Sequence, residues 1–216
     1  MQRLKFERNG AAPTVVCIGA HCDDIEIGCG GTLARWAREY SGATFVWGIF
    51  ASEGVREHES RAAAARLLEG AGRCELRFHD FRASYFPAQL ERIKDAFEVL
   101  KAEVRPDVVL THRLEDRHQD HRVLAELTWN TFRSHLILEY EIPKYEGDLG
   151  HPNVFVPLDA PVLDHKVRVL MESFPSQRSR QWFTEDTFRA LARLRGLECN
   201  APSGYAEAFH ARKVCL

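Results

Sequence analysis

The feature that most constrains the fold of this chain is a repeated alternation of strand-like and helix-like segments. Short apolar runs rich in β-branched residues predict buried strands at residues 14–20, 44–50, 74–78 and 107–111. Apolar residues at helical spacing predict helices over residues 31–40, 57–68, 87–103 and 118–135. Repeated strand–helix units imply a mostly parallel sheet, and right-handed crossovers place helices on both of its faces. We therefore predict an α/β fold, a Rossmann-like three-layer sandwich.

Beyond about residue 138 the alternation becomes irregular. Extended pieces are expected at residues 137–142 and 154–158, and helices near residues 164–172 and 185–195. The sequence contains no internal repeat, low-complexity stretch or evident linker. Its 216 residues suffice for one domain with a sizeable core, so we expect a single domain over residues 1–216.

Charge and hydropathy exclude several classes of partner. The net charge is −2, from 29 basic and 31 acidic residues, which indicates no affinity for nucleic acid or for anionic membranes. We interpret the arginines of residues 178–195 as a solvated helix face. No apolar run reaches the length of a membrane span, and the first ten residues lack the apolar core of a secretory signal. The six cysteines form no CxxC pair, so reduced thiols and a cytoplasmic location are expected.

Polar side chains crowd the loops that follow the first and fourth predicted strands. The first loop carries His21, Asp23 and Asp24, and the second carries His118 and His121. Sites in open α/β sheets form at the carboxyl ends of the strands, so both loops should converge at one edge. Histidine and carboxylate bind zinc, and three such ligands with an open position mark a catalytic site. Solvated loop charges and a helix-capping aspartate are the competing interpretation, which weakens because two clusters follow two strands.

A glycine-rich stretch, residues 28–32, follows the first cluster and is expected to be a loop that leads into a helix. Such a loop permits close backbone approach, or a helix N-terminus that faces an anion. The glycine spacing is not GxGxxG and two acidic residues precede it, so a dinucleotide site is disfavoured.

These motifs resemble the signature of the PIG-L/LmbE-like family of zinc-dependent N-deacetylases. The family's (P/A)-H-P-D-D segment corresponds to residues 20–24, its glycine-rich GGT stretch to residues 28–32, and its H-x-D-H motif to residues 118–121. Weaker similarities at residues 56–59 and 205–209 extend the resemblance through nearly the whole chain.

The resemblance implies roles for five of these side chains. His21, Asp24 and His121 would be the ligands of a Zn²⁺ ion, although Fe²⁺, Co²⁺ or Mn²⁺ also suits such a ligand set. Asp23 would be the general base. His118 would stabilise the oxyanion and protonate the leaving amine.

Four further residues receive an interpretation from the same resemblance. Asp120 would orient a histidine, as carboxylates commonly do at metal sites. Arg56 and Asp80 are candidate substrate contacts, although an ion pair at a helix terminus explains Arg56 equally well. Cys22 replaces the proline of the family motif, and we expect its thiol to turn away from the metal ligands. The loop-like residues 141–148 are one candidate for the border of the substrate pocket.

The function implied by the resemblance is hydrolysis of the N-acetyl group of an N-acetylglucosamine-like amino sugar or its conjugate. The expected partner is therefore a small-molecule amino sugar, and a homo-oligomer stays open. One alternative is a metal-dependent amidase for another amide, such as a thiol conjugate or a natural-product sugar. Others are a non-catalytic metal-binding module with a Rossmann-like fold and a purely structural protein. Asp23 argues against the binding module, because a mere binding site needs no general base. A structural protein would leave the ionisable groups at the ends of the buried strands without a reason.

Overall fold

A seven-stranded sheet forms the centre of the computed structural model, which describes residues 11–214. Its strand order is β3-β2-β1-β4-β5-β7-β6. The strands are β1 (Thr14–His21), β2 (Thr44–Ala51), β3 (Arg73–Phe78), β4 (Val108–His112), β5 (Leu136–Tyr140), β6 (Val154–Pro157) and β7 (Ala206–His210). The first five pair in parallel, while β7 runs antiparallel to both β5 and β6. The predicted α/β fold with a mostly parallel sheet is confirmed.

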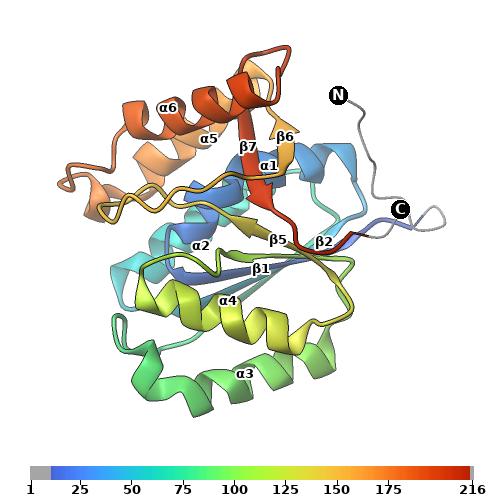
Figure 1. Cartoon of the computed structure of the whole chain (residues 1–216), viewed down its shortest axis with the longest axis vertical. Coiled ribbons are helices and arrows are strands. Elements are labelled where there is room, and N and C mark those ends of the chain that lie inside the picture. Colours follow the sequence, from blue (N-terminus) through green and yellow to red (C-terminus); the bar gives the residue numbers. More distant parts are fainter. Residues whose placement is uncertain (1–10, 215–216) are drawn as a thin grey trace.

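Helices cover both faces of this sheet. They are α1 (Asp24–Glu39), α2 (Val55–Leu67), α3 (Leu90–Glu103), α4 (Gln119–Thr131), α5 (Ala160–Ser173) and α6 (Glu185–Glu198). Figure 1 shows α3 and α4 together below the sheet, with α1, α5 and α6 above it. Helix α2 packs against α1 and α5 and so belongs to the upper layer.

Strand β1 shows how the sequence builds two cores at once. Successive side chains of a strand point to opposite faces of the sheet. Accordingly, Val15 and Cys17 belong to the core beneath the upper helices, whereas Val16 and Ile18 belong to the core beside α3 and α4. A strand buried on both faces has no polar side to alternate with, which explains its continuous apolar run.

The chain reverses the direction in which strands are added at β1. Strand β2 lies on one side of β1, and β4 lies on the other. Connections from the two strands leave toward opposite faces there and open a crevice at the carboxyl ends. His21 is the last residue of β1 and His112 is the last residue of β4, so both stand at this crevice.

The glycine-rich stretch is not a loop, contrary to expectation. Helix α1 begins at Asp24 and includes residues 28–32, all of which are buried. A Cβ atom on Gly28 would lie 2.2 Å from Cδ2 of Tyr140, and one on Gly31 would lie 2.6 Å from Cδ1 of Leu158. The glycines therefore let α1 approach its neighbours closely, which spacing along the sequence does not show.

Two predictions for the C-terminal third need correction. Residues 206–210 form β7, whereas the sequence indicated only a motif there, because a short strand between irregular segments carries no periodicity. The arginines of residues 178–195 are not all solvated. Arg195 is buried, and its Nη2 lies 2.7 Å from Oε1 of Glu141.

Two further expectations concern reduced cysteines and the lack of a membrane-spanning helix. The cysteines at positions 17, 22, 29, 74 and 199 are free, and Cys17 lies in the core. Cys215 and the N-terminal segment, for which no secretory signal is predicted, lie outside the described residues. Within residues 11–214, no helix has the length and apolar character needed to cross a membrane. The single domain over residues 1–216 stays a prediction.

Candidate metal centre and active site

Three atoms from the two predicted clusters form a nearly equilateral triangle. Nδ1 of His21 lies 3.3 Å from Oδ2 of Asp24 and 3.3 Å from Nε2 of His121. Nε2 of His121 lies 3.5 Å from the same oxygen of Asp24. A tetrahedral ion with bonds of about 2.0–2.1 Å separates its ligand atoms by about 3.3–3.4 Å. The donor set and its spacing therefore fit a tetrahedral divalent ion.

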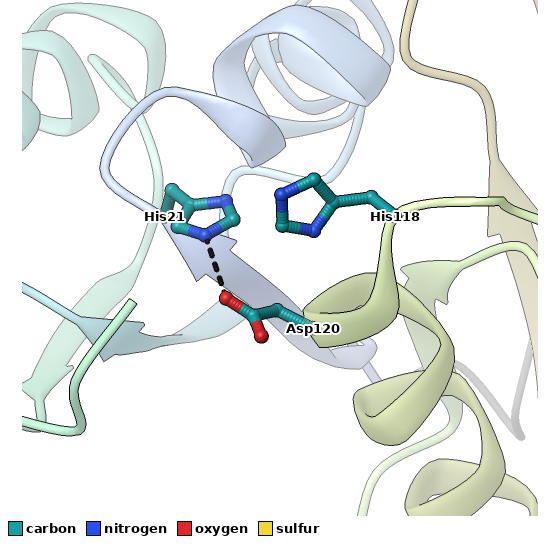
Figure 2. A group of neighbouring side chains, drawn as sticks. All are labelled: His21, His118 and Asp120. Atoms are coloured by element: carbon teal, nitrogen blue, oxygen red, sulfur yellow. Dashed lines mark hydrogen bonds and ion pairs between the residues drawn. The ribbon is translucent and has the colours of Figure 1, made fainter. Parts of the chain in front are cut away.

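Each histidine of this triangle has a carboxylate on its other ring nitrogen. Oδ2 of Asp120 lies 3.2 Å from Nε2 of His21, as Figure 2 shows, and Oδ2 of Asp116 lies 2.9 Å from Nδ1 of His121. A carboxylate in this position fixes the ring orientation and leaves the opposite nitrogen free to bind a metal. Asp120 thus contacts a histidine as predicted, and the histidine is His21.

The two histidines have opposite charge preferences. Burial lowers the pKa of His21, but the carboxylates of Asp24 and Asp120 outweigh burial and raise this pKa to about 10. Burial and the neighbouring His112 lower the pKa of His121 to about 3. The region therefore favours a single positive charge beside Asp24, where the triangle lies.

Asp23 is set apart from the triangle by its own partner. It occupies the N-cap position of α1, yet its side chain makes no capping hydrogen bond. Instead, Oδ1 of Asp23 lies 2.8 Å from Nη2 of Arg56. Burial raises the pKa of Asp23 despite this guanidinium, whereas the histidines around Asp24 hold its pKa well below the usual range. Adjacent carboxylates with separated pKa values are typical of an acid–base site.

His118 and Asp80 differ in their relation to the triangle. The ring of His118 lies 5.0 Å from that of His21, centroid to centroid, at an interplanar angle of 85°, and Figure 2 shows the two side chains side by side. Burial and the charge on His21 lower the pKa of His118. Within the described part of the chain, its Nδ1 is buried without a hydrogen-bond partner. Asp80 is exposed, and among residues 11–214 it makes no hydrogen bond or ion pair with this group.

Cys22 lies beside the site without joining it. Its buried Sγ donates a hydrogen bond to the carbonyl of Ala51, 3.6 Å away. Burial raises the pKa of this thiol to about 12, which keeps it protonated. Arg56, in the first turn of α2, pairs with Asp23 at the N-cap of α1, so the contact is an ion pair at helix termini and also lies beside the predicted base.

Three further residues contact the site, and none of them was predicted to support a metal ligand. Asp116 holds His121, and Nζ of Lys144 lies 3.0 Å from Oδ2 of Asp116. His112 is fully buried, and its Nε2 accepts a hydrogen bond from the backbone N–H of Ala20 at 2.9 Å. Asp116 could have been found from the sequence, because it lies two residues before His118 in the same polar loop. No sequence pattern links Lys144 to the site, because it lies 28 residues after Asp116 in an irregular segment.

The charges around the triangle leave a negative excess. Asp23 pairs with Arg56, and Asp116 pairs with Lys144. Within the described residues, the remaining two carboxylates, Asp24 and Asp120, contact histidines and backbone amides but no lysine or arginine.

Family comparison assigns the chain to a class. A family model described as "PIG-L: GlcNAc-PI de-N-acetylase" matches residues 16–132. This match spans β1 to α4 and so contains both loops of the candidate site. The chain belongs to the PIG-L family of deacetylases.

Individual relatives agree with this assignment. The chain is 34% identical over 139 residues to a protein named uncharacterized deacetylase YaiS of Escherichia coli K12, covering 60% of this chain and 74% of that protein. N,N'-diacetylchitobiose deacetylase from Pyrococcus horikoshii superposes with a TM-score of 0.69 at 22% identity, over 93% of this chain and 84% of that one.

A third similarity limits what the fold alone can show. GalB, the 4-carboxy-2-hydroxymuconate hydratase of Pseudomonas putida KT2440, superposes with a TM-score of 0.69 at 18% identity. The similarity covers 94% of this chain and 98% of that one. A hydratase and a deacetylase thus share this architecture, so the reaction must be argued from the site.

Proposed function

We propose that this protein is a zinc-dependent hydrolase that removes the N-acetyl group from an N-acetylglucosamine-like amino sugar or its conjugate. The observation that carries the proposal is the triangle of His21, Asp24 and His121 with a carboxylate behind each histidine. Family membership supports the deacetylation, and the names of relatives support an amino-sugar substrate.

The spacing of the triangle supports zinc over octahedral Mg²⁺. Adjacent ligands of an octahedral Mg²⁺ ion with bonds of about 2.0–2.1 Å would lie about 2.9–3.0 Å apart. The three distances of 3.3–3.5 Å exceed that value. Bound zinc would supply Lewis-acid polarisation of the amide carbonyl and acidify a coordinated water.

The residues of the chain divide the proton transfers between them. Asp23, held by Arg56 at 2.8 Å, is placed to accept a proton from the attacking water without occupying a ligand position. Its raised pKa strengthens it as a base. His118 donates a hydrogen bond to the developing oxyanion and a proton to the leaving amine, and its lowered pKa makes the protonated ring a stronger donor.

Acetate release tests the proposal. The zinc-loaded full chain is incubated with N-acetylglucosamine, N,N'-diacetylchitobiose and nucleotide- or lipid-linked N-acetylglucosamine, and free acetate is quantified. We expect release from at least one of these, and a loss of about 10²–10⁴-fold in kcat for Asp23→Asn with bound zinc unchanged. Asp95→Asn, an exposed carboxylate on α3, is the matched control and should keep wild-type activity.

One outcome would overturn the proposed function, and a second would overturn only the role of Asp23. If the chain binds one zinc ion but releases no acetate from any amide in the panel, the amidase for another amide and the binding module become the better interpretations. If Asp23→Asn keeps wild-type kcat, the protein is still a deacetylase but Asp23 is not its base.

A further inference from the structure

A lysine outside the family motifs is linked to the candidate centre through one carboxylate. Oδ2 of Asp116 receives two contacts, from Nδ1 of His121 at 2.9 Å and from Nζ of Lys144 at 3.0 Å. The side chains of His121, Asp116 and Lys144 are 4%, 3% and 10% exposed, respectively. At such burial a charge-assisted hydrogen bond is screened little by water and holds its partners firmly.

The second oxygen of Asp116 is also occupied. Oδ1 accepts a hydrogen bond from the backbone N–H of His118 at 2.8 Å. The carboxylate plane is therefore fixed by Lys144 on one oxygen and by the backbone on the other. This orientation directs Oδ2 at the Nδ1–H of His121 and leaves Nε2 as the metal-binding nitrogen.

Lys144 is itself anchored in the connection between β5 and β6. Its Nζ lies 2.6 Å from Oδ1 of Asp148, and Oδ2 of Asp148 accepts from the backbone N–H of Arg117 at 2.7 Å. Nη1 of Arg113 donates to the carbonyl of Asp148 at 2.6 Å. These contacts tie this connection to the loop after β4 that supplies His118 and leads to His121.

The other ligand histidine is supported differently. Asp120, behind His21, is held by the backbone N–H groups of Ser84 and Phe86 at 2.5 and 3.1 Å. Backbone donors cannot be removed by substitution, whereas the lysine behind Asp116 can. The support of His121 is therefore the one that a single side-chain change isolates.

We propose that Lys144 is a positioning residue that sets the metal affinity of this protein by orienting Asp116 against His121. The inference rests on the metal site of the proposed function, but its test requires no substrate. Lys144 neither belongs to the ligand triangle nor contacts it directly, and it acts through one intervening carboxylate.

Zinc affinity, measured by competition with a chromophoric chelator in the absence of substrate, tests the inference. Loss of a partner behind a ligand histidine typically weakens metal binding about 10–100-fold. We expect Lys144→Met to weaken zinc binding by about tenfold, because it acts one step further out than Asp116. Lys144→Arg should restore affinity, because it keeps a positive charge facing Asp116 and Asp148. Lys94→Met, which removes the partner of Glu98 on α3, is the matched control and should change nothing.

A double-mutant cycle separates positioning from general destabilisation. If Lys144 acts through Asp116, then Lys144→Met should weaken zinc binding no further in an Asp116→Asn background. Additive losses, an unchanged affinity in Lys144→Met, or a failure of Lys144→Arg to restore binding would each overturn the inference.

Two further measurements keep the test independent of folding and of activity. Should Lys144→Met not fold, Asp148→Asn removes the second anchor of the ammonium group and should still weaken zinc binding several-fold; an unchanged affinity there overturns the inference. A variant series with the expected affinities but no acetate release would reject the proposed function and leave this inference standing.

Discussion

Replacing Gly28 by alanine tests whether close packing explains the glycines inside α1. The added Cβ would lie 2.2 Å from Cδ2 and 2.7 Å from Cγ of Tyr140. That ring is fully buried, and its hydroxyl donates to the carbonyl of Ile18 at 2.6 Å. Neither the ring nor the helix can move without breaking a buried contact, so the substitution must strain the core.

The expected magnitude combines two opposing terms. Alanine in a helix interior is more favourable than glycine by about 0.5–1 kcal/mol. Overpacking a close-packed core costs about 1–3 kcal/mol and occasionally more. Because the clash is with a fixed aromatic ring, the cost should lie near the upper end and leave Gly28→Ala less stable by about 2 kcal/mol. For a chain of this length, that free energy lowers Tm by about 4–8 °C.

The matched control lies two residues along the same helix. A Cβ on Gly30 would approach only the flexible side chains of Leu67, at 3.2 Å, and Lys166, at 3.7 Å. Gly30→Ala should therefore be neutral or slightly stabilising. Urea denaturation, monitored by circular dichroism, gives the unfolding free energy of both variants, and their m-values should be equal to that of the wild type. If Gly28→Ala is as stable as Gly30→Ala, close approach of α1 to Tyr140 does not explain the glycine.

Three further predictions concern the metal and the buried ion pairs. At a free zinc concentration of 100 times Kd, the unfolding free energy measured by urea denaturation should exceed that of the chelator-treated protein by about 2.7 kcal/mol. The His121→Ala variant should lose this difference. Arg56→Met removes the cation that lowers the pKa of Asp23, so the acidic limb of the kcat profile should move to higher pH; an unmoved limb contradicts the pairing. Arg195→Met leaves Glu141 buried without its cation and should cost about 3–5 kcal/mol at pH 7 in urea denaturation. Burial raises the pKa of Glu141, but His210 and Arg195 lower it below the usual 4.5, so the pair stabilises the protein above that pH. The cost of Arg195→Met should therefore shrink as the pH falls below 4.5, and a constant cost would refute this reasoning.

The parts of the fold that the sequence predicts well are those with a strong local signal. Strand β1 carries an unbroken apolar run, and its observed bounds extend the predicted ones by a single residue, His21. The two polar loops were predicted to meet because parallel strands share one edge for their carboxyl ends. The triangle of His21, Asp24 and His121 is what that rule produces when the strands are neighbours, as β1 and β4 are.

The parts that escaped prediction depend on contacts between distant segments. Gly28 reads as a loop residue until the position of Tyr140, 112 residues later, requires a helix without a Cβ there. Arg195 reads as a surface residue because its buried partner, Glu141, lies 54 residues earlier in an irregular segment. The role of Lys144 likewise depends on a partner distant in the sequence, Asp116. In each case the deciding term is packing or pairing across the tertiary structure, and no local pattern encodes it.

The charge balance of the site argues against a purely structural role for it. Arg56 and Lys144 compensate two of the four carboxylates, and the other two, Asp24 and Asp120, converge on His21. Buried carboxylates that lack a cation cost stability, and a core selected for stability alone would have replaced them. Here they hold the pKa of His21 near 10, so the ring retains a proton when nothing else supplies positive charge. A divalent ion on the triangle would displace that proton and balance both carboxylates, because ligand binding requires the neutral imidazole. The cost of an unbalanced site is thus explained if the folded protein is built to hold a cation.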